Sequence, residues 1–243
     1  MKKLASGIVA LTALIATPAM AADMPVKAAP APLLFSWTGC YLGVHAGAGW
    51  QVSSYTGGGH IASGVGGLGG AQAGCNAQWR QFVIGIEGEF WGSSLYDREY
   101  FQEGSFSTDS YSRNRWDGAI SVRSGVAFDR AFIYGKLGVV WGKFDYTTDV
   151  VFPGGTATER GDAIFTGVLI GVGFEYALTD NWTTKFEYNY IDYGNTIVNF
   201  TSVECNPACT TFTFSQAIKE TKQIAKIGVN YKFAYDNPIS ARY

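Results

Sequence analysis

The chain has 243 residues, of which 47% are hydrophobic, 15% are aromatic and only 16% are charged, and it contains 31 glycines. So few charges would leave an ordinary soluble surface too apolar, and a net charge of −2 without a basic run excludes a nucleic-acid-binding face. The length fits one domain, and the glycine and aromatic content favours a β-barrel.

The N-terminus predicts export from the cytoplasm. Lys2 and Lys3 precede an apolar run at residues 4–16, and Ala19-Met20-Ala21 supplies the small residues that a signal peptidase reads. Residues 1–21 are therefore predicted to be a signal peptide. No later apolar run approaches the ~20 residues that a membrane helix needs, so the exported chain is either soluble or crosses a membrane as strands.

A Pro- and Ala-rich lead-in follows at residues 22–36, and the composition of residues 24–34 favours an extended, unpacked segment. From Trp37 onward, apolar and polar residues alternate in eight stretches. These are longer than the ~5–6 residues of a typical globular strand and suit a tilted membrane crossing. The predicted strands are residues 37–51, 68–79, 82–92, 116–128, 131–144, 165–177, 182–191 and 221–233.

The connections between these strands alternate in length. Residues 80–81, 129–130 and 178–181 are predicted tight turns, and residues 52–67, 93–115, 145–164 and 192–220 are predicted long loops. Outer-membrane barrels sort their connections in this way, with short turns in the periplasm and long loops outside the cell. The predicted fold is therefore all-β, an eight-stranded antiparallel up-and-down transmembrane β-barrel over residues 37–233.

The stretch from Ile120 to Trp141 shows how the two faces of the strands differ. Val122 and its even-numbered neighbours are apolar, whereas Arg123 lies on the opposite face, and Lys136 takes the polar face after the turn. A membrane barrel directs its apolar face to lipid and its polar face to the lumen. The alternation of apolar and polar residues does not by itself distinguish a membrane barrel from a soluble one. The alternation of short turns and long loops favours the membrane barrel.

On this assignment nearly all the strand charges fall on the lumen face, and the two signs balance. The predicted lumen ion network is Glu87, Glu89, Arg123, Lys136, Glu175, Lys185, Glu187 and Lys226. Uncharged polar residues on the same face include His45, Gln72, Asn76, Asn189 and Asn230. The pattern has three exceptions, which are Ser124 on the lipid face and the apolar Phe132 and Leu169 on the lumen face.

Several segments resemble one family when they are taken together. WTGCYLGVHAGAGW, VIGIEGEF, VRSGVAFDRAFIYGKLGV, WTTKFEYNYIDYG and KIGVNYKF, with the mature start AADMPVKAAPAP, are similar to the small porin-family surface proteins of alphaproteobacterial outer membranes, relatives of the OmpA transmembrane domain. The resemblance implies an abundant, antigenic barrel in the Gram-negative outer membrane, in contact with membrane lipids and lipopolysaccharide and inserted by the barrel assembly machinery. Two features depart from the pattern. No peptidoglycan-binding domain follows the barrel, and residues 234–243 extend past Phe233, the position of the usual terminal aromatic residue.

The four cysteines suit an exported protein, in which disulfides persist. Cys40 and Cys75 lie on the lipid face of two adjacent predicted strands, and Cys205 and Cys209 frame a short segment of the last loop. We predict these two pairings, and the alternative for each pair is two free thiols. A metal site would need all four cysteines together, whereas the topology places the pairs at opposite ends of the barrel.

Other motifs are better explained by structural roles than by catalysis or cofactor binding. Residues 64–69 match a dinucleotide-binding glycine pattern, but that site needs a following helix, and here the glycines run into an alternating strand. His45 is expected in the lumen and His60 in a loop, without a catalytic partner. Glu87 and Glu89 could suggest acid-base chemistry, but the basic residues predicted nearby favour a structural ion network.

Three hypotheses about function follow. The first is a structural envelope protein that interacts with extracellular ligands through its long loops. The second is a small-solute pore, although an eight-stranded barrel is just filled by its own side chains. The third and weakest is a lipid-modifying enzyme. No nucleophile and base cluster, cofactor site or metal site is predicted. The sequence does not identify a ligand, a solute or an oligomeric state.

Overall fold

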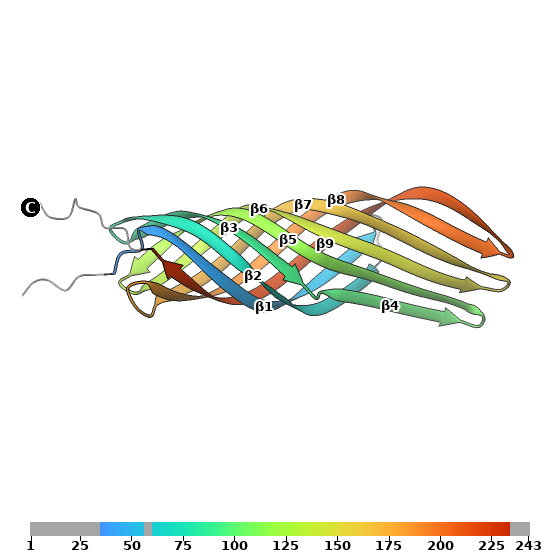
Figure 1. The fold of residues 1–243 in the computed structure, drawn as a ribbon, viewed down its shortest axis with the longest axis horizontal. Helices are drawn as coiled ribbons and strands as arrows, with labels where there is room; N and C mark the ends of the chain where they lie inside the picture. The colour runs from blue at the N-terminus through green and yellow to red at the C-terminus, as the bar shows by residue number, and fades with distance from the viewer. Residues whose placement is uncertain (1–34, 56–59, 234–243) are drawn as a thin grey trace, which may run out of the picture. The chain divides into compact units, whose positions relative to one another are not determined.

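The computed structural model describes residues 35–55 and 60–233, and these residues form nine antiparallel strands (Figure 1). The strands are β1 (Gly39–Tyr55), β2 (His60–Trp79), β3 (Phe82–Ser93), β4 (Tyr96–Glu103), β5 (Phe106–Phe128), β6 (Ala131–Phe152), β7 (Gly155–Ala177), β8 (Trp182–Asn206) and β9 (Ala208–Lys232). Within the described ranges, no helix is long and apolar enough to span a bilayer. The predicted signal peptide, most of the lead-in and the extension at residues 234–243 lie outside them.

Eight of the nine strands close into a ring, which confirms the predicted barrel. The sheet order is β3-β2-β1-β9-β8-β7-β6-β5-β4, and an additional pairing of β3 with β5 closes it. The ninth strand, β4, pairs only with β5. The pairing of Gly92 with Trp116 is the last between β3 and β5, and β4 then takes the place of β3 beside the outer part of β5.

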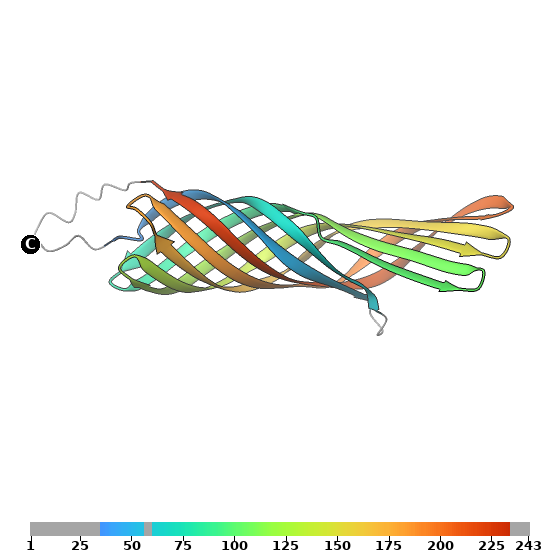
Figure 2. The same cartoon turned by 90° about the horizontal axis from the view of Figure 1, so that it is seen from below.

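All four predicted long loops are wrong over most of their length, because the chain stays in strands there. In the first of them, residues 52–55 belong to β1 and residues 60–67 belong to β2. β4 with β5, β6 with β7, and β8 with β9 form three long hairpins that continue beyond the ring (Figures 1 and 2). We call residues 96–115, 143–166 and 192–220 the three arms. Outside the bilayer no lipid contacts the outer face of a strand, so the alternation of apolar and polar residues weakens. Cross-strand hydrogen bonds still form, and they hold the arms.

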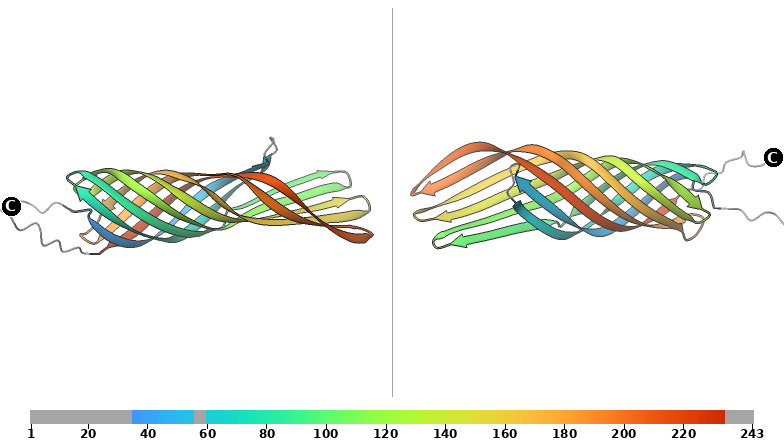
Figure 3. Two further views of the ribbon diagram at one scale, coloured as in Figure 1. Left: turned by 90° about the horizontal axis from the view of Figure 1, so that it is seen from above. Right: turned by 180° about the vertical axis from the view of Figure 1, so that it is seen from behind.

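The two-residue turns appear where they were predicted. Asp129 and Arg130 join β5 to β6, and Asp129 has a φ of 51°. Arg80, in the turn between β2 and β3, has a φ of 55°. Tight hairpins require this left-handed conformation, which an Asp side chain tolerates better than most. These turns lie at the end of the ring opposite the arms (Figure 3), so they mark its periplasmic side.

The faces of the strands are inverted relative to a soluble barrel, as predicted. Val122 is 50% exposed on the outside of β5, whereas the next residue, Arg123, has no exposed surface inside. Aromatic residues flank the outer apolar band. Trp79, Phe128 and Trp182 lie near the turns, and Trp50 and Phe90 lie near the arms. This arrangement is typical of a transmembrane barrel with aromatic belts at both interfaces.

The interior contains two apolar clusters in addition to its polar residues. The turn-side cluster comprises Phe35, Trp37, Val83, Ala127, Phe132, Tyr134 and Ala177. The arm-side cluster comprises Leu68, Trp91, Ala119, Val140, Phe144, Tyr146, Phe165, Leu169, Ile191, Tyr193, Val198, Phe200, Ile218 and Ile224. Phe132 and Leu169, which broke the sequence pattern, each belong to one of these clusters. Their inward orientation is therefore a packing feature.

Candidate functional site: the filled barrel interior and the arms

The structure brings all eight residues of the predicted lumen ion network together. They come from six strands, namely β3, β5, β6, β7, β8 and β9, and each is 5% exposed or less. Lys136 is central, because its Nζ lies 2.5 Å from both Glu87 Oε1 and Glu89 Oε2 and 3.5 Å from Glu187 Oε2. Every carboxylate of the network therefore has a cationic partner inside the barrel.

Two further lysines complete the pairing around the three central carboxylates. Lys185 Nζ lies 3.0 Å from Glu87 Oε2 and 3.2 Å from Glu187 Oε1. Lys226 Nζ lies 2.6 Å from Glu89 Oε1 and 3.0 Å from Glu187 Oε2. Three ammonium groups thus contact three carboxylates, each with at least two partners of opposite sign. Removing any one group would leave an unbalanced buried charge, and breaking a buried pair typically costs about 3–5 kcal/mol.

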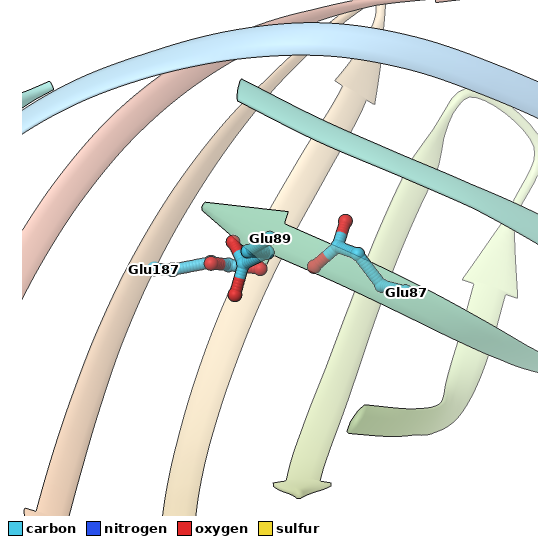
Figure 4. A group of neighbouring side chains, drawn as sticks. All are labelled: Glu87, Glu89 and Glu187. Atoms are coloured by element: carbon cyan, nitrogen blue, oxygen red, sulfur yellow. The ribbon is translucent and has the colours of Figure 1, made fainter. Parts of the chain in front are cut away.

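Figure 4 shows Glu87, Glu89 and Glu187 directed toward one another, the first two from β3 and the third from β8. Their carboxylate oxygens lie within 4.8 Å of one another, a spacing that would suit a metal ion. The ammonium groups of Lys136, Lys185 and Lys226 already supply the positive charge there. The arrangement is therefore explained by ion pairing alone.

Two tyrosines are held against this network by glycines on neighbouring strands. Tyr41 pairs with Gly74, and Tyr134 pairs with Gly173. A Cβ atom at Gly74 would lie 2.6 Å from Tyr41 Cζ, and one at Gly173 would lie 2.4 Å from Tyr134 Cζ. Only glycine leaves room for the two rings. The Tyr41 hydroxyl donates to Glu87 and the Tyr134 hydroxyl to Glu187, each over 2.7 Å.

A second buried ion pair lies closer to the arms, and the sequence analysis did not single it out. Lys222 Nζ is 2.7 Å from Asp117 Oδ1, and neither side chain is exposed. The Tyr193 hydroxyl also donates to Asp117, and Lys222 Nζ lies 4.5 Å from the centre of the Phe144 ring. Both charged residues fall on the lumen face of predicted strands. The alternation of inward and outward side chains, which located the other eight charged residues, would therefore have located these two as well.

The periplasmic mouth is closed by residues that precede β1. Trp37 is 1% exposed, and its indole Nε1 donates 3.0 Å to the carbonyl of Asp129, while its backbone amide donates 2.7 Å to Gln78. The Phe35 amide donates 2.9 Å to the Asp129 carboxylate. Phe35 belongs to the predicted lead-in but follows residues 24–34, the part predicted to be unpacked, which lies outside the described residues. An apolar ring can bury itself in the turn-side cluster, which composition alone did not indicate.

The remaining predicted residues are distributed as follows. Cys40 is disulfide-bonded to Cys75 on the outer surface between β1 and β2, and Cys205 to Cys209 near the tip of the β8–β9 hairpin. The glycine-rich residues 64–69 lie within β2, with no helix after them. His45 is buried, with its Nδ1 2.6 Å from Gln72 Oε1. The side chain of His60 lies outside the described residues.

The arms enclose a cavity of about 200 Å³ on the side that continues the barrel interior. Its walls include Tyr146 and Thr148 of β6, Glu159 of β7, Phe200 of β8, and Phe214 and Gln216 of β9. Sequence analysis had placed these residues in separate loops, so it had no basis for bringing them together. The cavity lies in the part of the protein that extends outside the membrane band.

Comparison with known proteins places the chain among outer-membrane proteins. Residues 8–233 match the family model described as the outer membrane protein beta-barrel domain. The 31 kDa outer-membrane immunogenic protein of Brucella melitensis biotype 1 is 32% identical over 246 residues, which cover 93% of this chain and 98% of that protein. A 22 kDa outer membrane protein of Rhizobium leguminosarum bv. viciae is 29% identical over 213 residues, 88% of this chain and 83% of that one.

Among solved structures, the outer membrane protease OmpT from Escherichia coli aligns with a TM-score of 0.47 and 12% identity. The alignment covers 83% of this chain and 99% of that chain. A likeness this distant does not transfer the protease activity.

Proposed function

Because this chain belongs to the outer-membrane β-barrel family, we propose that it is a closed structural protein of the outer membrane whose three arms interact with ligands outside the cell. The proposal assigns the barrel an anchoring role and the arms a recognition role. Outer-membrane lipids, including lipopolysaccharide, are the expected neighbours of the outer apolar face.

The observation that carries this proposal is that side chains fill the interior at three successive levels. Trp37 and Phe132 lie at the turn side, the ion network around Lys136 lies in the middle, and Trp91 and Phe165 lie at the arm side. All four of these aromatic rings are at most 1% exposed. Eight strands enclose only enough space for side chains, whereas water-filled porins use about 16 to 18 strands. A filled barrel of this kind supports an anchor better than a pore.

The arms support the second half of the proposal. Strand pairing holds them along their length, and the β6–β7 register runs without interruption to the pair Phe152 and Gly155. Several large apolar side chains on the arms are exposed, among them Tyr100, Phe101, Ile197 and Phe212. Exposed apolar side chains gathered on an ordered extracellular scaffold favour interaction with another molecule. No enzymatic role is proposed, since the buried carboxylates are held in ion pairs.

Single-channel recording of the mature protein in planar bilayers tests the proposal. We expect no discrete conductance steps from the wild type. We expect none from Arg123→Ala either, because the turn-side and arm-side clusters still close the lumen on both sides of the altered residue. A large porin added to the same bilayer is the positive control. Reproducible steps from the wild type would show that the barrel is a pore, and steps from Arg123→Ala alone would identify the ion network as its gate.

A further inference from the structure

We propose that the cavity between the arms binds an organic cation. The positive group is an alkylguanidinium or alkylammonium that meets the Glu159 carboxylate, and its body packs against the aromatic rings of Tyr146, Phe200 and Phe214. The inference rests on the proposed function, because it gives a ligand class to the arms that were proposed to recognise extracellular molecules.

Strand pairing places the carboxylate on the inner side of the arms. Glu159 of β7 pairs with Thr148 of β6 on one side and with Ser202 of β8 on the other. Glu159 is an even number of residues away from Leu169 and Glu175, which lie on the part of β7 inside the ring and are both buried. Its side chain therefore points to the same, inner face of the strand as theirs. The carboxylate therefore points into the cavity, and both of its cross-strand neighbours are uncharged.

The opposite wall of the cavity is aromatic. Phe200 of β8 pairs directly with Phe214 of β9, and their rings are stacked with centroids 5.3 Å apart. The Tyr146 ring lies 6.1 Å from that of Phe200. Aromatic faces attract cations through the ring quadrupole, and a cation over such a face gains about 0.5–2 kcal/mol. The aromatic wall and the carboxylate therefore favour the same kind of ligand.

The charge around the cavity also favours a cation. The Glu159 carboxylate forms no ion pair or hydrogen bond with any other residue in ranges 35–55 and 60–233, and partial burial raises the pKa of this carboxyl group. Deeper in the arms, the Tyr146 hydroxyl donates 2.6 Å to a second carboxylate, that of Glu220. By sequence the three arms hold eleven acidic and six basic side chains. A cation entering the cavity would supply the partner that Glu159 lacks.

The size of the cavity fits a side-chain-sized ligand. Its volume of about 200 Å³ is far above the ~10–15 Å³ that a single water molecule needs on the same measure. Such a cation could be a free amine or guanidine, or the side chain of a basic polypeptide. Both sources share the chemistry of a positive head on an aliphatic stem, and the probes in the experiment separate them.

The experiment is an NMR titration of the full mature protein, refolded in an uncharged detergent with its phenylalanines labelled, so that Phe200 and Phe214 report on binding. The probes are butylguanidinium, the neutral isostere butylurea, and a tetra-arginine peptide. We expect saturable shifts with butylguanidinium and none with butylurea. A lower dissociation constant for the peptide than for butylguanidinium would identify a basic polypeptide as the natural source of the cation. An equal or higher dissociation constant for the peptide would identify a free small molecule. Either result supports the proposal.

Variants assign the binding to the cavity. Glu159→Gln should weaken butylguanidinium binding about tenfold or more, the loss expected for one charge-assisted hydrogen bond. Phe214→Leu should weaken it about fivefold, through loss of a cation–π contact. The matched control is Glu103→Gln, which removes the same charge from an exposed position on the β4–β5 arm and should leave binding unchanged.

Several outcomes would overturn the proposal. They are equal binding of butylurea, equal weakening by the two glutamine variants, and the absence of saturable shifts at millimolar concentrations of either cationic probe. None of these outcomes depends on conductance. If the cationic probes do not bind and the wild type shows no conductance in planar bilayers, only the proposed ligand class is wrong. If the wild type conducts, the proposed function is wrong.

Discussion

Arg123 of β5 and Glu175 of β7 form an ion pair across the barrel interior, with Nη1 and Oε2 2.9 Å apart and both side chains buried. Arg130 and Asp180, in two neighbouring periplasmic turns, form a pair of the same length, but their side chains are 38% and 86% exposed. The two pairs share chemistry and distance and differ in burial. Comparing variants of the two pairs therefore measures how much burial in the barrel interior changes the contribution of an ion pair to stability.

Arg123→Ala should lower the free energy of unfolding by up to about 3–5 kcal/mol, because Glu175 loses its buried partner, although water entering the lumen would reduce this loss. Arg130→Ala should cost about 1 kcal/mol or less, as is usual for exposed pairs. Urea unfolding of both variants in the same lipid vesicles measures the difference. Equal losses of unfolding free energy would mean that water screens the charges inside the barrel as strongly as it screens those on the surface.

Val122→Arg tests the outer face directly beside Arg123. An arginine on the lipid-facing surface near the bilayer midplane should destabilise the inserted barrel by about 2–4 kcal/mol. Val122→Leu, which keeps the position apolar, is the control and should fold normally. Folding yield into vesicles is the readout. Normal folding of the arginine variant, together with an unchanged Arg123→Ala, would show that the two faces had been assigned the wrong way round.

Asp117 and Lys222 form the second buried pair, and a double-mutant cycle measures their coupling. Lys222→Met alone leaves Asp117 charged and without its cation, whereas adding Asp117→Asn removes that charge as well. We expect the double variant to be more stable than the single lysine variant, with a coupling energy of about 1–3 kcal/mol. Thermal unfolding in detergent provides the four stabilities. Additive losses would indicate that the two groups act independently.

Mass spectrometry of peptides from the non-reduced protein should recover Cys40 linked to Cys75 and Cys205 linked to Cys209. Chain-entropy arguments give about 4 kcal/mol for the bridge that spans 35 residues and about 2 kcal/mol for the bridge that spans four. Replacing Cys40 and Cys75 by serine should therefore lower stability more than replacing the other pair. A Cys75–Cys205 peptide would contradict the strand order.

Much of the barrel interior was predictable from alternation alone. Once Arg123 and Lys136 fix the lumen parity of β5 and β6, counting in twos along the other strands locates Glu87, Glu175 and their partners, because successive strand side chains point to opposite faces. The same counting reaches Asp117 and Lys222. The contacts between these residues were not predictable, since ring closure and strand stagger decide which side chains lie at the same height.

The sequence by itself determined that the chain is exported, that its strands cross a membrane, and that its charges face inward, because the lipid environment imposes an apolar outer face on every crossing strand. Only the tertiary structure decided what happens beyond the bilayer. There, strand pairing rather than lipid contact holds the chain, so the sequence carries no strict alternation. The pairing of β7 with β6 and β8 is what brings Glu159 to the same cavity as Tyr146 and Phe200. The closure of the periplasmic mouth by Phe35 and Trp37 likewise depends on the Asp129 turn, which is more than ninety residues away in sequence.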